Sequence, residues 1–160
     1  MTTRALPTVD VVVLDDAWRA KLRTCRALVA RSAAAALAGR GVRRGAGVVV
    51  ALANDRTVRL LNRAYRGRDK ATNVLAFAEC DARSPDPASL GDVLLALGTV
   101  AREAEAQGKT LAQHAAHLVV HGTLHLLGFD HVEEAEARRM EAAERRALAR
   151  IGVPDPYRIP

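Results

Sequence analysis

Residues 121–131 read HGTLHLLGFDH, an apolar run that carries three histidines. His121 and His125 are four residues apart, so on a helix both imidazoles lie on one face, one turn apart. Gly128 can adopt a left-handed backbone and end that helix, which lets the chain turn and bring His131 toward the same point. Three neutral imidazoles with a fourth position open are typical of a catalytic zinc site, because structural sites usually fill all four positions. The sequence therefore predicts a helix and turn whose histidines bind one metal ion.

The same histidine spacing occurs in one group of zinc peptidases, the metzincins, whose motif is HExxHxxGxxH. This chain matches that motif at each histidine and at Gly128, but Gly122 stands where the peptidases keep a glutamate as general base. A single histidine on an apolar face is more often an ordinary core or surface residue. Three at this spacing favour metal binding, and the missing base favours chemistry other than peptide hydrolysis. A metallopeptidase is the less favoured alternative.

Three neighbouring side chains are candidates for supporting this site. His114 and His117 precede the run on the same predicted helix, in the angular sector that holds the first two ligands. They are candidates for orienting a ligand or contacting substrate, although an ordinary polar position beside a sheet fits them equally well. Asp130 either accepts a hydrogen bond from a ligand imidazole or caps the next helix, and capping is favoured.

Apolar periodicity predicts an α+β fold: a four-stranded mixed sheet packed with about five helices, with the histidine helix in a central position. At 160 residues the chain is expected to form a single domain, residues 1–160. The predicted strands cover residues 9–14, 47–53, 73–77 and 91–97. The predicted helices cover residues 17–38, 54–65, 99–107, a stretch that begins at Thr110, and 132–151.

Charge and composition narrow the partners and the compartment. Lysine and arginine exceed aspartate and glutamate by 24 to 18, which gives a net charge of +6. This balance favours a polyanion such as RNA, although it also serves simple solubility. Cys25 and Cys80 lie far apart with no CxxC partner, which fits the cytoplasm. No run of about 18 apolar residues predicts a membrane helix, and we expect no signal peptide.

A charged turn follows the second predicted helix. An arginine beside a metal site offers a planar fork for a phosphate, although the common role of a surface arginine is solvation. Aromatic residues make up only 3% of the chain, so RNA binding is expected to depend on phosphates rather than on stacking. The candidate RNA-binding residues are Arg63, Arg68, Lys70, Arg43 and Arg44.

Several blocks in order resemble the YbeY family of bacterial metal-dependent endoribonucleases, also called rRNA maturation factors. These blocks are LNRAYR at 61–66, TNVLAF at 72–77, LGDV at 90–93, residues 117–131 and PDPY at 154–157. Ala71 and Ala76 depart from the proline and serine that the family usually has, which bears on local loop shape.

The resemblance implies a zinc ion on His121, His125 and His131 and a functionally important arginine at Arg66. It also implies a cytoplasmic endoribonuclease that cuts single-stranded RNA, matures the 3′ end of small-subunit ribosomal RNA and serves ribosome quality control. An Era-type GTPase and a small-subunit ribosomal protein are the partners it implies. The open alternative is a non-enzymatic ribosome assembly factor whose zinc is structural.

Overall fold

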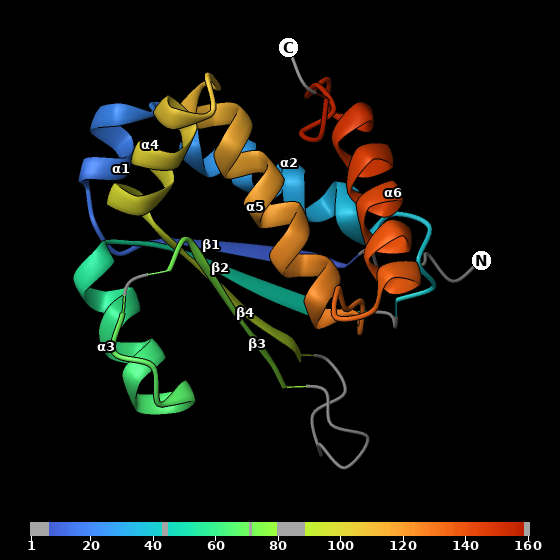
Figure 1. Ribbon diagram of the computed structural model, residues 1–160, viewed down its shortest axis with the longest axis horizontal. Helices are drawn as coiled ribbons and strands as arrows, with labels where there is room; N and C mark the ends of the chain where they lie inside the picture. The colour runs from blue at the N-terminus through green and yellow to red at the C-terminus, as the bar shows by residue number, and fades with distance from the viewer. Residues whose placement is uncertain (1–6, 43–44, 71, 80–88, 159–160) are drawn as a thin grey trace.

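The fold was analysed in a computed structural model that describes residues 7–42, 45–70, 72–79 and 89–158 (Figure 1). The elements alternate between strand and helix along the first half of the chain and are helical after the fourth strand. In order they are β1 (Thr8–Val13), α1 (Ala17–Lys21), α2 (Cys25–Leu37), β2 (Gly47–Ala53), α3 (Asp55–Arg66), β3 (Val74–Ala78), β4 (Ser89–Ala96), α4 (Leu97–Ala106), α5 (Leu111–Leu126) and α6 (Glu134–Arg150).

The four strands form one mixed sheet in the order β1-β2-β4-β3. The first three in this order are parallel, and β3 pairs antiparallel with β4 at the edge. The two central strands, β2 and β4, carry nearly continuous apolar runs because both of their faces are covered. The edge strand β1 alternates between exposed and half-buried residues, as a strand with one solvated face does. The predicted mixed four-stranded sheet is thus confirmed.

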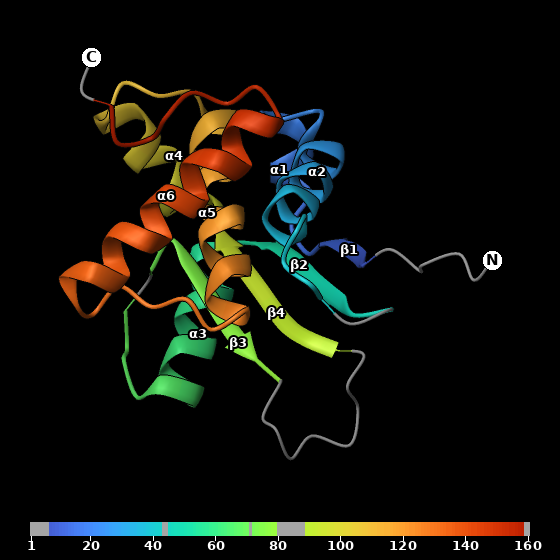
Figure 2. The ribbon, with the colours of Figure 1, turned by 90° about the vertical axis from the view of Figure 1, so that its right-hand side faces the viewer.

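Helices pack on both faces of this sheet, but unequally. The α2, α4, α5 and α6 helices lie on one side, and α3 lies alone on the other (Figures 1 and 2). The larger core between sheet and helices contains fully buried Val50, Leu95 and Val119. The predicted central position of the histidine helix is confirmed, because α5 touches α2, α4, α6, β3 and β4.

The helix predicted over residues 17–38 is two helices, which brings the described helices to six. The backbone leaves the helical region at Leu22, where φ is −145° and ψ is 89°. The short α1 places Trp18 with no exposed surface, and its indole Nε1 donates to the carbonyl of Ala53 at 2.8 Å. The apolar spacing continues across the break, because periodicity reports which side chains are buried and not whether the backbone is continuous.

Among the residues that the structure describes, none of the helices combines the length and apolar character that crossing a membrane requires.

Candidate metal centre

The α5 helix is fixed at both ends by its own sequence. At its start, Thr110 and Gln113 form a reciprocal capping box in which each side chain accepts from the other's backbone N–H. After its last residue, Gly128 adopts a φ of 95°, a conformation that favours glycine, and the chain reverses. His121 and His125 therefore share the last turns of the helix, and His131 returns to them after the reversal. The helix and turn predicted from the spacing are present.

The three histidines bring one ring nitrogen each to a common point. These donor atoms all lie within 4.8 Å of one another. The Nε2 atoms of His121 and His125 are 3.1 Å apart, and the ring of His131 lies 5.1 Å from that of His125, centroid to centroid. Three imidazoles that converge from one helix and one turn, with His131 exposed, fit a metal ion that keeps a position open on the solvent side.

The environment of His125 favours the neutral imidazole that a metal requires. Burial lowers the pKa of His125, and repulsion from His121 and His131 lowers it further. Like-charged neighbours oppose protonation here, so the ring keeps a free lone pair at neutral pH. A set of three histidines at this separation is more compatible with one shared cation than with three added protons.

Gly122 lies where the helix meets the sheet. A Cβ atom at this position would stand 2.7 Å from Cγ1 of Val93 and 3.3 Å from Cγ2 of Val74. Position 122 thus points at the sheet and has no room for a side chain. A glutamate base of the peptidase kind has no place here, which supports the reading that this metal site does not hydrolyse peptides.

The residue that the sequence analysis missed is Glu144 of α6. It has no exposed surface, and its Oε1 lies 2.7 Å from Nδ1 of His121. Its Oε2 lies 2.9 Å from Nε2 of His117 and accepts from the hydroxyl of Tyr157. Burial by itself raises the pKa of the carboxyl, but the hydrogen bonds from His117, His121 and Tyr157 outweigh it and lower the pKa of Glu144 to about 2.

A cleft of about 1020 Å³ opens beside the histidines, and cationic side chains are among those that line it. Arg66, at the end of α3, lines this cleft together with Arg68 and Lys70. The guanidinium of Arg66 donates to the carbonyl of Ala76 on the edge strand β3 at 2.6 Å and lies over the ring of Phe77, 5.3 Å from its centroid. The predicted arginine and the predicted metal ligands therefore face one cavity from opposite sides of β3.

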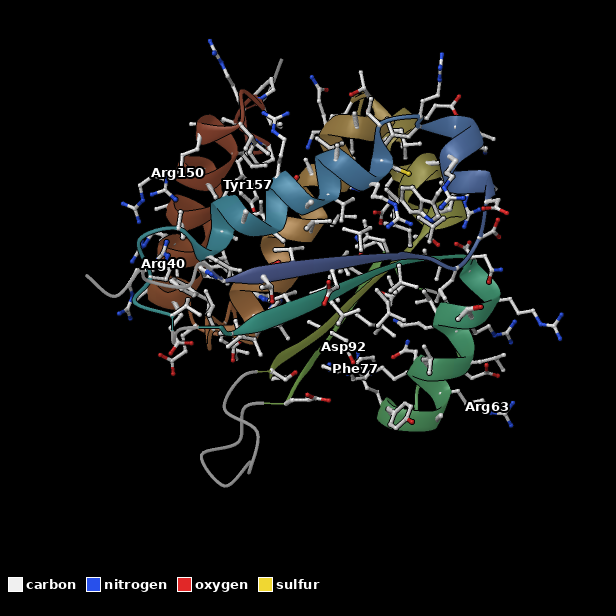
Figure 3. The ribbon with its side chains drawn as sticks, turned by 180° about the vertical axis from the view of Figure 1, so that it is seen from behind. Arg40, Arg63, Phe77, Asp92, Arg150 and Tyr157 are labelled. Carbon is white, nitrogen blue, oxygen red and sulfur yellow. The ribbon has the colours of Figure 1, made fainter. Side chains whose placement is uncertain are left out.

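The remaining candidates are placed less directly. Arg63 is exposed and projects outward from α3 (Figure 3), and it is not among the side chains that line the cleft. Arg43 and Arg44 lie outside the described residues. His114 is turned toward α4, where its Nε2 lies 2.9 Å from Oε1 of Glu103. Nε2 of His117 contacts Oε2 of Glu144, and the His117 ring lies 6.3 Å from that of His121, centroid to centroid.

The expected capping role of Asp130 is wrong. Its Oδ1 accepts from the backbone N–H of His131 at 2.7 Å. The N-cap residue of α6 is Glu133, and no side chain caps that helix. The reason is distance along the chain: α6 begins four residues after Asp130, too late for its side chain to reach the first turn. Asp130 instead fixes the backbone of the third histidine.

Comparison with known proteins extends these observations. The family model described as "Endoribonuclease YbeY" matches residues 13–152. A protein named Endoribonuclease YbeY from Azorhizobium caulinodans is 49% identical over 95% of this chain and 97% of its own length. One of the same name from Paramagnetospirillum magneticum is 48% identical over 94% of this chain and 98% of its own.

A Thermotoga maritima protein whose structure was solved in solution shares the fold. The TM-score is 0.54 with 18% sequence identity, and the match covers 89% of this chain and 91% of that one.

Proposed function

Because this chain belongs to the YbeY family of endoribonucleases, which are hydrolases that cut phosphodiester bonds of RNA, we propose that it cuts single-stranded RNA with the help of one zinc ion held by His121, His125 and His131. Arg66 is the residue that engages the scissile phosphate. We further propose that the whole chain acts as one domain in the cytoplasm, on the 3′ end of small-subunit ribosomal RNA and in ribosome quality control. An Era-type GTPase and a small-subunit ribosomal protein are its proposed partners.

The observation that carries the proposal is the shared cleft. Three converging imidazoles and the guanidinium of Arg66 line one cavity, with the edge strand β3 between them. A phosphodiester needs a cationic clamp on its oxygens and a site that activates the attacking group, and the cleft brings both kinds of residue into its lining. Two further cations, Arg68 and Lys70, line the same cavity and suit the flanking phosphates.

The chain's own residues divide the work in a definite way. A zinc ion held by His121, His125 and His131 would supply Lewis acidity and would activate water near neutral pH. The three histidines hold their donor nitrogens toward one point. Arg66 donates one N–H to the carbonyl of Ala76, and this hydrogen bond fixes the guanidinium. The other N–H groups of Arg66 can then donate to phosphate oxygens. Charge that builds on the phosphate in the transition state is thus met by a preset donor.

The test compares metal content with RNA cutting in purified protein. Wild type, His125→Ala, Arg66→Ala and a matched control, Arg19→Ala, are analysed for zinc by elemental analysis and for cleavage of a single-stranded RNA on gels. Arg19 is an exposed arginine on α1 that pairs with Asp16. We expect about one zinc per wild-type chain, loss of zinc and cutting in His125→Ala, and retained zinc with at least tenfold slower cutting in Arg66→Ala.

Arg19→Ala controls for the loss of one positive charge and is expected to behave as wild type. If all four proteins cut equally while wild type carries zinc, the cutting does not come from this site. The zinc would then be structural, and a role as a ribosome assembly factor without nuclease chemistry would replace the proposal.

A further inference from the structure

The side of His121 that faces away from His125 is occupied by the carboxylate of Glu144. Nδ1 of His121 lies 2.7 Å from Glu144 Oε1, while its Nε2 lies 3.1 Å from Nε2 of His125. We propose that Glu144 is a positioning residue of the metal site, which holds His121 in the tautomer that presents Nε2 to the metal. The inference rests on the proposed metal site and adds a residue from α6 to it.

The chemistry of the donors leads to one tautomer. His117, His121 and Tyr157 can each donate one hydrogen to the two oxygens of Glu144. This arrangement suits an ionised carboxylate, which can only accept hydrogen bonds. Nδ1 of His121 must then carry the proton. In a neutral imidazole the lone pair is left on Nε2, the atom that points at His125. The hydrogen bond from Nδ1 of His121 to Glu144 thereby leaves Nε2 as the nitrogen that binds the ion.

The charge of Glu144 gives a second, independent reason. A carboxylate without exposed surface is normally paired with a cation. In the part of the chain that the structure describes, the ion-pair partners of Glu144 are only the histidines His117 and His121, and neither lysine nor arginine reaches it. A divalent ion on the far side of the His121 ring would supply the missing positive charge.

The other two partners of Glu144 fix its orientation. Tyr157, in the segment after α6, and His117 both contact Oε2, and their rings pack edge to face with centroids 5.4 Å apart. Within the described residues, the hydrogen-bond partner of Oε1 is His121. The segment after α6 therefore supports the proposed ligand His121 through Glu144.

Zinc affinity of the full-length protein, measured by competition with a chromophoric chelator, tests the proposal. Glu144→Met keeps the approximate shape of the side chain without an acceptor, and Glu144→Gln keeps an acceptor without the charge. We expect Glu144→Met to weaken zinc binding by about 10- to 100-fold and Glu144→Gln to fall between it and wild type. Glu103→Gln is the matched control, because Glu103 makes the same kind of bond to His114 of the same helix. It should stay within about twofold of wild type, as His114 is not a ligand.

Nitrogen-15 NMR of the metal-free protein at mildly alkaline pH reads the tautomer directly. We expect the wild-type His121 ring to carry its proton on Nδ1 and Glu144→Met to lose that preference, while Glu103→Gln keeps it. This measurement on wild type needs no substitution, so the proposal stays testable even if Glu144→Met does not fold.

A proton on Nε2 of His121 in wild type would overturn the proposal, and so would unchanged zinc affinity in a folded Glu144→Met protein. Absence of zinc binding by wild type would instead overturn the proposed function, a result that these measurements distinguish from the other two.

Discussion

At the scale of single residues, Gly122 has no room for a side chain because α5 packs directly on the sheet at this position. Its Cα lies so close to the sheet that a methyl group would meet Val93 at 2.7 Å. We expect Gly122→Ala to lower the free energy of unfolding by about 1–3 kcal/mol, because overpacking against a branched side chain outweighs the gain in helix propensity. Urea denaturation followed by circular dichroism measures this difference.

A matched substitution on the same helix separates overpacking from a general effect of a methyl group. Ala116→Gly, at a buried α5 position, removes a methyl group and should also destabilise the protein, through cavity and propensity. Equal or higher stability of Gly122→Ala would show that α5 can shift away from the sheet without loss.

The two kinds of site residue differ in how far sequence alone could find them. The three histidines fall within a stretch of eleven residues, 121–131, and their spacing is a local property of a helix and a turn. Glu144 is 23 positions from His121, and their contact depends on how α6 packs on α5. One signal was present: Glu144 lies four residues from Met140 and four from Leu148, both buried, so an acid sits on the apolar stripe of its helix.

At the scale of elements, Asp55 connects two helices on opposite sides of the sheet. It is the first residue of α3, and its carboxylate accepts from the backbone N–H of Thr99 at 2.9 Å and pairs with Arg102, both in α4. We expect Asp55→Ala to lower the free energy of unfolding by about 1–2 kcal/mol, as loss of a helix cap does. Chemical denaturation near neutral pH measures this loss, and Asp69→Ala, which breaks an exposed pair with Arg59, is a control expected to change little.

The same carboxylate gives the stability a pH dependence with a known sign. Burial acts to raise the pKa of Asp55, but the hydrogen bonds from Thr99 and Arg102 outweigh it and hold the pKa below the usual value near 3.8. A lowered pKa in the folded state gives stability that is present above the unfolded pKa and lost as the pH falls through the folded one. The stability gap between wild type and Asp55→Ala should therefore shrink as the pH falls from about 5 to about 3. A gap that is constant over this range would contradict the ionised pairing.

The strands and most helix ends were predicted to within about two residues, and the exception is the break inside the first predicted helix. The β-branched and apolar runs located each strand to within about two residues, because buried strands leave a composition signal. The break between α1 and α2 left no such signal, and the anchor of α1 is a contact far along the sequence, from the indole of Trp18 to the carbonyl of Ala53. The order of strands was likewise beyond reach, because β4 enters between β2 and β3 through tertiary packing alone.

At the scale of the whole molecule, the proposed binding of a metal ion would be linked to folding. A ligand that binds only the folded state adds about 2.7 kcal/mol when present at 100 times its Kd. For a chain of this size, removing zinc with a chelator should lower the melting temperature by about 5–10 °C. Thermal unfolding followed by circular dichroism, with and without chelator, checks this expectation. His125→Ala should show no such shift, and a similar shift in that variant would mean that the ion binds elsewhere.

The cationic cleft should make RNA binding depend on salt. The chain has a net charge of +6, and Arg66, Arg68 and Lys70 line one wall of the cleft. If each contacts one phosphate of a single strand, the logarithm of the binding constant should fall against the logarithm of salt concentration with a slope of about −2. Fluorescence anisotropy with metal-free protein and a labelled RNA of mixed sequence measures the slope. Lys70→Ala should reduce it by about 0.7, and an affinity indifferent to salt would contradict phosphate recognition.

On each of the two edge strands of the sheet, an arginine side chain donates a hydrogen bond to a backbone carbonyl. On β1, the carbonyl of Val11 accepts from the guanidinium of Arg26, and on β3 the carbonyl of Ala76 accepts from that of Arg66. An unpaired strand edge is a template for another chain, and a charged side chain over its carbonyls blocks the addition of a further strand. We therefore expect Arg66 to limit self-association at the β3 edge as well as to face the cleft, and we expect its removal to leave that edge open to a second copy.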